Sequence, residues 1–237
     1  MTLRVASYNV HKCLGFDRIR SAARIVHVIA TLEADIVALQ EVDHRIAPRH
    51  AALPAPLVTA RTGLVPLAFA HNDVSLGWHG QTILIRKGLA ATATGRIDLP
   101  GLEPRGAVLA EIVTPIGPLR VVGAHLGLVR RFRLLQLDTI RAAIAARPRM
   151  PTVIMGDFNE WSPTAGTLPL ARDYRIHAPG PSFPAMKPVA RLDRIALSRE
   201  LHLHDAGAAT GRTARIASDH LPVWADISLE PPPARAG

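Results

Sequence analysis

Eight polar side chains stand at the ends of short apolar runs, at the points where strands would leave the protein interior. Such groups are costly to bury near a sheet unless each finds a partner. Six of them supply oxygen ligands that suit Mg²⁺ or Mn²⁺, and the scarcity of thiols argues against structural zinc. The pattern therefore indicates a site for a hard divalent cation. The eight residues are Asn9, Glu41, Asp157, Asn159, Asp193, Asp219, His125 and His220.

The spacing of four of these residues repeats. Asn9 and Glu41 are separated by 32 positions, and so are His125 and Asp157. Each pair would close one strand–helix–strand unit, whose two parallel strands end at the same edge of a sheet. Neighbouring strands lie about 4.8 Å apart, so polar groups at those ends can converge on one ligand. Two such units facing each other would bring all four side chains to one crevice.

Alternating stretches along the chain predict the elements that position these groups. Runs rich in β-branched residues, bounded by Gly, Pro, Asp or Asn, predict eight strands joined in part by helices, which indicates an α/β class. The strands are expected at Leu3–Val10, Asp35–Val42, Thr82–Arg86, Val108–Val113, Leu119–Leu126, Thr152–Met155, Leu192–Leu197 and Leu221–Ser228. Apolar residues at helical spacing predict helices at Ser21–Glu33 and Phe132–Arg147. His44–Asn72 and Ser162–Pro188 are rich in Pro and Gly without a clear period, so we expect two long surface loops.

The length of 237 residues fits one domain, expected at residues 1–229, and the proline-rich residues 230–237 are predicted to be a disordered tail. Cys13 is the single cysteine, which excludes an intrachain disulfide and fits a reducing compartment. No run of about 18 apolar residues occurs, and the first ten residues lack the apolar stretch of a signal peptide. We therefore expect a soluble cytoplasmic protein with no transmembrane segment.

The chain is strongly basic, with 28 Lys+Arg against 19 Asp+Glu, a net charge of +9 and a pI near 11.0. A basic surface concentrates nucleic acid, phospholipid headgroups or other anions. Only three of the basic residues are lysines, and the arginines are scattered rather than clustered. A general bias toward arginine therefore remains an equal alternative to a functional basic surface.

Read with their flanks, the polar residues form six ordered motifs: SYNVHKC (7–13), LQEVD (39–43), GAHLGL (123–128), MGDFNEW (155–161), ARLDRIALS (190–198) and SDHLPVWADI (218–227). Through these motifs, from Ser7 to about Asp226, the chain resembles the endonuclease/exonuclease/phosphatase superfamily with the deoxyribonuclease I-like fold, and in particular its compact bacterial members. A lone GDFN would be a weak signal, whereas the ordered set is specific. The resemblance implies a four-layer α/β sandwich of the α+β kind, in which two packed, mainly antiparallel sheets carry helices on the outside.

The resemblance also implies hydrolysis of a phosphodiester or phosphomonoester with Mg²⁺ or Mn²⁺. Glu41 would be the principal metal ligand, with Asn9 and Asp219 close to the metal. Asp157 would orient or deprotonate the attacking water, and Asn159 would hold that water or a phosphate oxygen.

Two histidines complete the implied site. His220 would act on the phosphate or as a base, with Asp193 accepting from its other ring nitrogen. His125 would contact the phosphate or serve as acid to the leaving group. Whether one or two metals act, and whether His220 is a base or a stabiliser, stays open.

Further candidates for substrate binding lie around these motifs. His11 and Lys12 follow Asn9 at the rim of the crevice, and Gln81 occupies the position where family members often carry Asn. Arg130 and Arg131 begin the second crossover helix, where they could clamp a phosphate with paired hydrogen bonds. An ordinary exposed, charged helix start is the alternative for the two arginines.

The expected function is a metal-dependent phosphoesterase that acts on a phosphate-ester substrate, more on a diester than on a monoester. One alternative is a DNA endonuclease or exonuclease, favoured by the charge but not by an aromatic content of only 4%. Another is a phospholipid or small-molecule phosphatase, for which access to lipid would rest on charge alone. A catalytically silent binding module is the third, since a fold never establishes activity. No obligate protein partner can be inferred.

Overall fold

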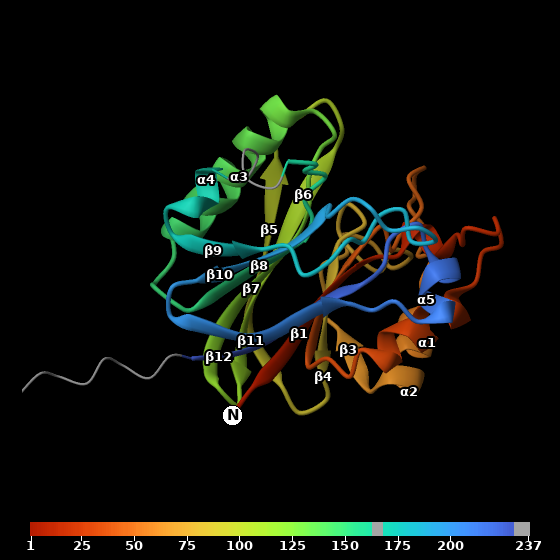
Figure 1. The fold of residues 1–237 in the computed structure, drawn as a ribbon, viewed down its shortest axis with the longest axis horizontal. Helices are drawn as coiled ribbons and strands as arrows, with labels where there is room; N and C mark the ends of the chain where they lie inside the picture. The colour runs from red at the N-terminus through yellow and green to blue at the C-terminus, as the bar shows by residue number, and fades with distance from the viewer. Residues whose placement is uncertain (163–167, 230–237) are drawn as a thin grey trace, which may run out of the picture.

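The computed structural model describes residues 1–162 and 168–229. The predicted tail at 230–237 lies outside the described residues. Two six-stranded sheets lie face to face, with α3 and α4 on one outer side and α1, α2 and α5 on the other (Figure 1). Every strand pairing in the described residues is antiparallel except β1 with β2 and β7 with β8. The expected four-layer sandwich with mainly antiparallel sheets is therefore confirmed.

The first sheet has the strand order β11-β12-β1-β2-β4-β3. Its strands are β11 (Leu201–Ala208), β12 (Val223–Leu229), β1 (Leu3–Asn9), β2 (Ile36–Gln40), β4 (Thr82–Arg86) and β3 (Leu64–Pro66). Helix α1 (Ala22–Thr31) connects the parallel strands β1 and β2, and α2 (Ala55–Thr62) and α5 (Arg212–Ala217) lie beside it. A short 3-10 turn (His11–Cys13) follows β1. The Ser21 hydroxyl caps α1 by accepting from the Arg24 N–H at 3.3 Å.

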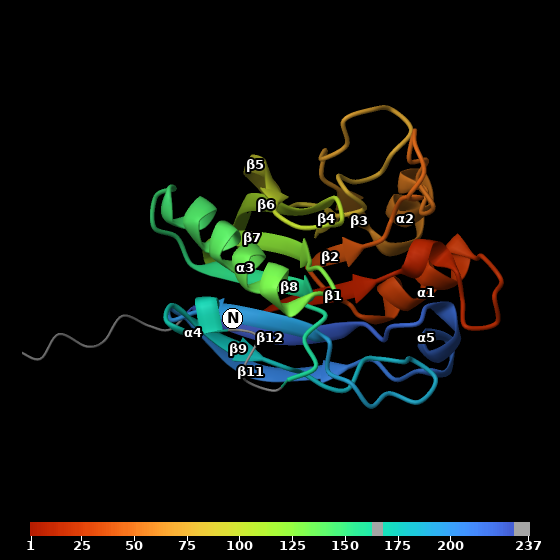
Figure 2. The same ribbon diagram turned by 90° about the horizontal axis from the view of Figure 1, so that it is seen from above.

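The second sheet has the order β5-β6-β7-β8-β10-β9. Its strands are β5 (Ala90–Leu99), β6 (Arg105–Thr114), β7 (Gly117–His125), β8 (Thr152–Asp157), β10 (Asp193–Ser198) and β9 (Tyr174–His177). Helix α3 (Arg130–Ala145) connects the parallel strands β7 and β8 and lies over them, as Figure 2 shows, and α4 (Leu168–Ala171) precedes β9. Both crossover units predicted from the repeated spacing are present.

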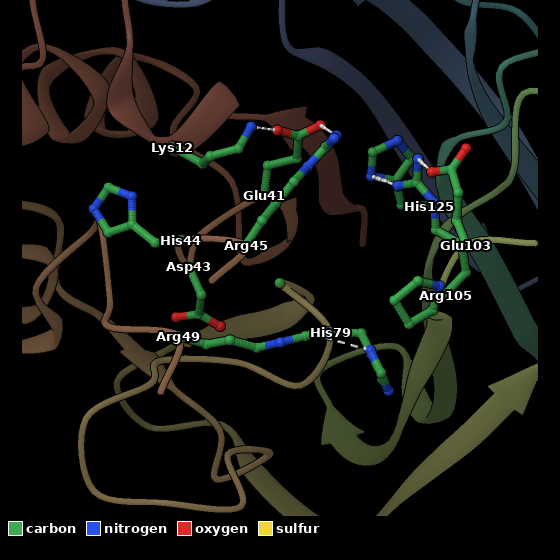
Figure 3. A pocket seen from close by; sticks show the side chains of 12 residues that line it. Lys12, Glu41, Asp43, His44, Arg45, Arg49, His79, Glu103, Arg105 and His125 are labelled. Atoms are coloured by element: carbon green, nitrogen blue, oxygen red, sulfur yellow. Dashed lines mark hydrogen bonds and ion pairs between the residues drawn. The ribbon is translucent and has the colours of Figure 1, made fainter. Parts of the chain in front are cut away.

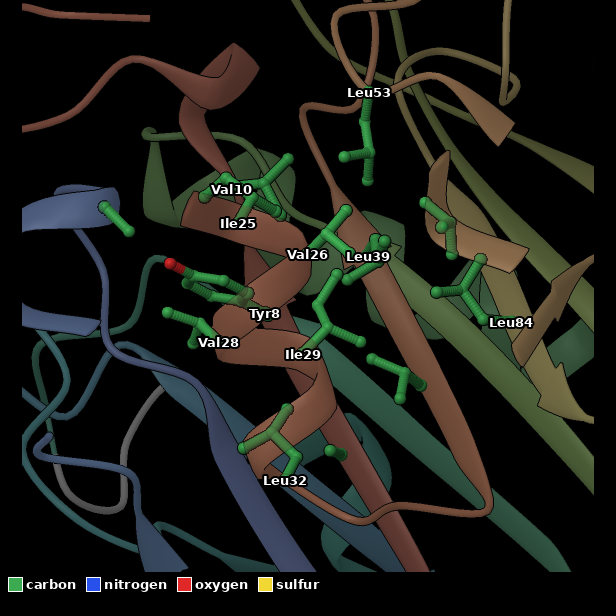
Figure 4. Close-up of a cluster of buried hydrophobic side chains, with 14 of the residues drawn as sticks. Tyr8, Val10, Ile25, Val26, Val28, Ile29, Leu32, Leu39, Leu53 and Leu84 are labelled. Carbon is green, nitrogen blue, oxygen red and sulfur yellow. The ribbon is translucent and has the colours of Figure 1, made fainter. Parts of the chain in front are cut away.

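Alternating side chains along the strands build three separate apolar layers. In β2, Val37 and Leu39 pack with α1, whereas Ile36 and Ala38 pack between the sheets. Figure 4 shows the outer cluster, in which Leu39 lies beside the buried apolar face of α1. A corresponding outer layer lies beneath α3. Because apolar side chains fill most of the space along the strands, the strand ends are where a larger group of polar side chains can gather.

The structure contains all eight predicted strands, with ends shifted by a few residues, and adds β3, β5, β9 and β11. The prediction of an irregular loop over His44–Asn72 is wrong in part, because it contains α2 and β3. Helix α2 follows Pro54 and ends at Gly63, which has a φ of +69°, so the residues that suggested a loop are its boundary signals.

The second predicted loop, Ser162–Pro188, is likewise wrong in part, since α4 and β9 lie within it. Both elements are only four residues long, too short to show a period in the sequence. Among the helices in the described part of the chain, none combines the length and apolarity that a membrane span requires.

Candidate active site

Four strand ends and one strand start meet at one edge of the sandwich. Asn9 is the last residue of β1, and Glu41 directly follows β2. His125 and Asp157 end β7 and β8 and lie opposite each other in the parallel ladder. Strand β10 runs antiparallel to β8, so it begins at this edge with Asp193 opposite Asp157. The topology of each sheet therefore gathers its polar ends at one edge, and the packing of the two sheets brings these edges together.

A hydrogen bond across the sandwich joins the two crossover units. The Asn9 side-chain N–H donates to Asp157 Oδ2 at 3.1 Å, and both residues are buried. The Ser218 hydroxyl donates to the Asn9 carbonyl at 2.7 Å, which ties the segment before β12 to the same point. Asp157 is further held by the Asn159 backbone N–H, which donates to Oδ1 at 2.9 Å. Asp157 thus lies at the centre of the cluster.

His220 lies between two buried carboxylates. Its Nδ1 is 2.9 Å from Asp193 Oδ2, and its Nε2 is 3.5 Å from Asp157 Oδ2. The Ser182 hydroxyl donates to the same Asp193 oxygen at 2.5 Å. Burial lowers the pKa of His220, but the charges of Asp193 and Asp157 outweigh it and raise the pKa to about 10. His220 is therefore an imidazolium at neutral pH.

His125 has the opposite electrostatic environment. The Arg105 guanidinium lies 2.8 Å from His125 Nδ1, and a guanidinium can only donate, so Nδ1 accepts. The proton of the neutral ring is then on Nε2, which lies 3.4 Å from Asp157 Oδ2. Burial lowers the pKa of His125 to about 4, and Arg105 acts in the same direction against the attraction of Asp157. His125 is therefore an uncharged donor at neutral pH.

Glu41 stays ionised at the neighbouring strand end. Burial raises its pKa, but positive charge on His125, Lys12 and Arg45 outweighs burial and lowers the pKa to about 2. Because His125 is neutral at pH 7, Lys12, which pairs with Glu41, and Arg45, at 3.7 Å, are the cations that act there. Glu41 has a φ of +57°, a strained backbone conformation of the kind that collects at functional sites. Gly80 packs closely against the Glu41 backbone, because a Cβ added at Gly80 would lie 3.4 Å from the Glu41 Cα.

The donor atoms fit a hard divalent cation. Asp157, Asp193 and His220 have oxygen and ring-nitrogen atoms that all lie within 4.8 Å of one another. Because the protonated ring of His220 has no free lone pair, the two carboxylates are the groups of this buried cluster that could hold a metal ion. Asp193 Oδ1 is buried and finds no hydrogen-bond partner within residues 1–162 and 168–229. Glu41 offers a second possible position for the metal ion. Its carboxylate already attracts a cation there, the ammonium group of Lys12. Carboxylate oxygens at both positions match the preference of Mg²⁺ or Mn²⁺.

Three further residues predicted from the sequence, Asp219, Asn159 and Gln81, differ in how their side chains are held. Asp219 Oδ1 accepts from the Ser218 hydroxyl at 3.3 Å and is 3.6 Å from His11 Nδ1. Asn159 has a φ of +50°, and its side-chain N–H donates to the Leu126 carbonyl at 2.9 Å. Gln81 is fully buried, and neither its amide nitrogen nor its amide oxygen has a hydrogen-bond partner among the residues that the structure describes.

Arg130 and Arg131 lie elsewhere. Both are exposed at the start of α3, and the Arg131 guanidinium stacks 4.8 Å from the ring centroid of Phe132. Neither contributes to the cavity beside Glu41. The roles of these residues, and of every residue assigned a role from the motifs, stay predictions.

Sequence reasoning missed three residues that contact the cluster. Ser218 is the first residue of the SDHLPVWADI motif and holds Asn9, so its motif carried a signal. Ser182, which holds Asp193, lies eight residues before the ARLDRIALS motif and outside it. Arg105 carried none, because only the pairing of β6 with β7 brings it to His125.

Comparison with known proteins identifies a family and a full-length relative. The model of the Endonuclease/Exonuclease/phosphatase family matches residues 6–220. The uncharacterized protein YbhP of Escherichia coli K12 is 31% identical over 249 residues, covering 96% of this chain and 97% of YbhP.

Two solved structures show the same fold at lower identity. An endonuclease/exonuclease/phosphatase from Beutenbergia cavernae superposes with a TM-score of 0.73 at 22% identity, over 96% of this chain and 72% of that one. The mannosyl-6-phosphatase Bt3783 of Bacteroides thetaiotaomicron gives a TM-score of 0.76 at 17% identity, over 96% of this chain and all of that one.

Proposed function

We propose that this chain, which belongs to the endonuclease/exonuclease/phosphatase family, hydrolyses phosphoester bonds with water in a metal-dependent reaction and prefers diesters. One observation carries the proposal. Asp157 Oδ2 accepts from Asn9 and is approached by His125 at 3.4 Å and His220 at 3.5 Å. A buried carboxylate between two imidazoles in different protonation states is an arrangement for moving a proton near an anion.

Asp157 is the residue best placed to act on water. Both of its oxygens are held, Oδ1 by the Asn159 N–H at 2.9 Å and Oδ2 by Asn9 at 3.1 Å, so the carboxylate keeps one orientation. We assign it the positioning of the attacking water and the acceptance of its proton. A divalent cation bound at Glu41, with Asn9 and Asp219 nearby, would supply charge neutralisation on the phosphate and make water more acidic.

The two histidines take different parts. His220, with a pKa of about 10, is already protonated at neutral pH, which favours the role of cationic stabiliser over that of base. His125 donates from Nε2 as a neutral ring and has no acidic proton to spare. We therefore assign His125 the contact to a phosphate oxygen rather than protonation of the leaving group.

Hydrolysis of bis(p-nitrophenyl) phosphate tests the proposal. The purified protein should release nitrophenol with Mg²⁺ or Mn²⁺ and stop when a chelator is added. Asp157→Ala should lower kcat by about 10²- to 10⁴-fold, the usual contribution of a positioned proton acceptor. Asp138→Ala, which removes an exposed carboxylate on α3, is the matched control and should keep the full rate. Absence of metal-dependent turnover, or full activity of Asp157→Ala, would refute the proposal.

A DNA nuclease is the second candidate, and one feature favours it. Trp161 is exposed and lies edge-on to Phe183, with ring centroids 6.3 Å apart, and Phe183 lies 5.0 Å from His220. Such aromatic groups beside the site offer a platform on which a base can stack. Supercoiled plasmid, abasic duplex, glycerophospholipid and an aryl phosphomonoester, assayed side by side, separate a nuclease from a lipid or small-molecule phosphatase.

A cytoplasmic location, expected from the single cysteine, stays part of the proposal.

A further inference from the structure

A cavity of about 200 Å³ opens directly beside the candidate active site. Glu41 and His125 form one end of it, and Arg49 and His79 form the other (Figure 3). A phosphoester bound at Glu41 and His125 would therefore place one of its substituents in this cavity. The chemistry of the far end decides which substituent fits.

Two arginines, Arg45 and Arg49, give the cavity positive charge, and the carboxylates that interact with them, Glu41 and Asp43, are also bound by other donors. Arg45 is mostly exposed, and the nearest carboxylate to its guanidinium is Glu41, at 3.7 Å, which Lys12 already occupies. Arg49 contacts the His79 ring nitrogen Nδ1 at 3.1 Å, and no ion pair to a carboxylate is found for it among residues 1–162 and 168–229. Both guanidinium groups thus keep hydrogen-bond donors and charge for an anion.

The acidic residues of the same cavity are committed to other contacts. Asp43 accepts from the backbone N–H groups of Leu76 and Gly77, at 2.7 and 3.1 Å, and Arg49 acts on it through charge rather than through a hydrogen bond. Glu103 pairs with Arg105 at 2.7 Å, and Arg105 is also bound to His125. The cations left for a ligand are therefore Arg45 and Arg49.

The backbone around Arg49 is held in place before any ligand arrives. Its N–H donates to the Ile46 carbonyl at 2.8 Å, and its own carbonyl accepts from the Ser75 hydroxyl at 2.7 Å. The nearby Asn72 amide donates to the Pro48 carbonyl at 3.1 Å. A guanidinium on a fixed turn loses little conformational freedom on binding, which makes it effective in holding a phosphate or carboxylate.

We propose that this cavity binds a second anionic group of the substrate, a phosphate or a carboxylate, through Arg49 at its far end, while Arg45, beside Glu41, adds positive charge along the way. The preferred substrate is then a phosphoester whose substituent carries its own negative charge beyond the bond that is cleaved. This inference rests on the proposed function for the identity of the reaction, but the binding of the second anion can be measured without any turnover.

Binding of two phosphonates, which cannot be hydrolysed, tests the subsite by itself. In Mg²⁺-containing buffer, calorimetry should show propane-1,3-bisphosphonate binding about 10- to 100-fold more tightly than propylphosphonate, the range expected for hydrogen bonds to charged groups. Arg49→Gln should reduce this ratio strongly, and Arg45→Gln, which removes charge at the Glu41 end, should reduce it less. Arg141→Gln removes an arginine on α3, outside the cavity, and should keep the ratio. Equal affinity of the two compounds for the unaltered protein would overturn the inference.

A matched pair of chromogenic diesters extends the test to catalysis. p-Nitrophenyl propyl phosphate carries a neutral tail, and the corresponding esters with a terminal phosphonate or carboxylate carry an anionic one. The unaltered protein should show a higher kcat/KM for an anionic tail, and the larger of the two gains identifies phosphate or carboxylate as the group bound. Hydrolysis of all three esters at equal kcat/KM would leave the proposed function standing and refute the subsite. No hydrolysis of any ester, with the bisphosphonate still bound preferentially, would refute the function and leave the subsite.

Discussion

His125 and His220 lie on two sides of one Asp157 oxygen and carry different charges at neutral pH. The difference comes from the group behind each ring. Asp193 lies behind His220 and stabilises its protonated form, whereas Arg105 lies behind His125 and stabilises the neutral form with the proton on Nε2. Partners that contact no substrate therefore decide which histidine is a cation and which is a neutral donor.

Replacing Arg105 tests this account at the level of one proton. In Arg105→Met, Nδ1 of His125 loses its donor, so the ring should become a mixture of both neutral tautomers. Nitrogen-15 NMR of the imidazole distinguishes the two, because a protonated and an unprotonated ring nitrogen differ widely in chemical shift. The unaltered protein should show His125 as the Nε2–H form only.

The assignment and the control for this measurement use the same spectrum. His125→Asn identifies the His125 signals by their loss, and Arg96→Met removes an exposed arginine that contacts His71 instead. The Arg96 variant should leave the His125 signals in place. An unaltered protein in which His125 carries its proton on Nδ1 would contradict the hydrogen-bond assignment.

At the scale of elements, the position of the site follows from how the strands run. Each crossover unit brings two strand ends to one edge, and the antiparallel strands β10 and β12 begin at that edge after their own loops. Strand β12 pairs with β1, although the two lie at opposite ends of the sequence. The pairing of β12 with β1 therefore holds Asp219 and His220 next to Asn9.

The ion pair between Arg4 and Asp226 should contribute measurably to the pairing of β1 with β12. Two hydrogen bonds of 2.7 Å join them, and the Arg4 guanidinium also lies 4.5 Å from the Trp224 ring centroid. Asp226→Asn should lower the free energy of unfolding by about 1 kcal/mol at pH 7, measured by urea denaturation. Asp73→Asn, which changes an exposed carboxylate, is the control and should have little effect.

The effect of Asp226→Asn should depend on pH in one direction. The hydrogen bond from Arg4 lowers the pKa of Asp226 in the folded protein relative to the unfolded chain. Its contribution is therefore complete above the unfolded pKa of about 3.9 and is lost as the pH falls through the lower folded value. The difference between the two proteins should be full at pH 7 and should shrink at pH 3. A difference that grows on acidification would contradict the ion-pair account.

What could be predicted from the sequence was set by local signals. Asn9, His125 and Asp157 end strands with a clear apolar pattern. Parallel pairing of these strands therefore predicted that the three side chains lie at strand ends on one edge and converge. Strand β5 alternates between exposed and less exposed positions, but it was missed because most of its inward positions are Ala or Gly, whose apolar signal in the sequence is weak. Arg49 and Arg105 could not be placed, since their positions depend on the path of a turn and on the register between β6 and β7.

At the scale of the whole molecule, the two sheets share one apolar layer, and the candidate site lies at its end. Side chains from β1, β2, β4 and β12 meet those from β6, β7, β8 and β10 in that layer. Gly123 on β7 shows how close the contact is, because an added Cβ would lie 3.2 Å from Ala38 Cβ on the other sheet. The distance between the sheets therefore determines whether Asn9 can reach Asp157.

Truncating a side chain in the shared layer should therefore destabilise both sheets together. Ile83 on β4 is fully buried in this layer, and Ile83→Ala should lower the free energy of unfolding by about 2–5 kcal/mol through lost burial and a residual cavity. The transition followed by circular dichroism should coincide with that followed by tryptophan fluorescence, because neither sheet keeps a complete core alone. Ile46→Ala, at an exposed isoleucine, should leave the transition nearly unchanged. Two separate transitions would mean that the sheets unfold independently, and the site would then depend on their docking rather than on one cooperative fold.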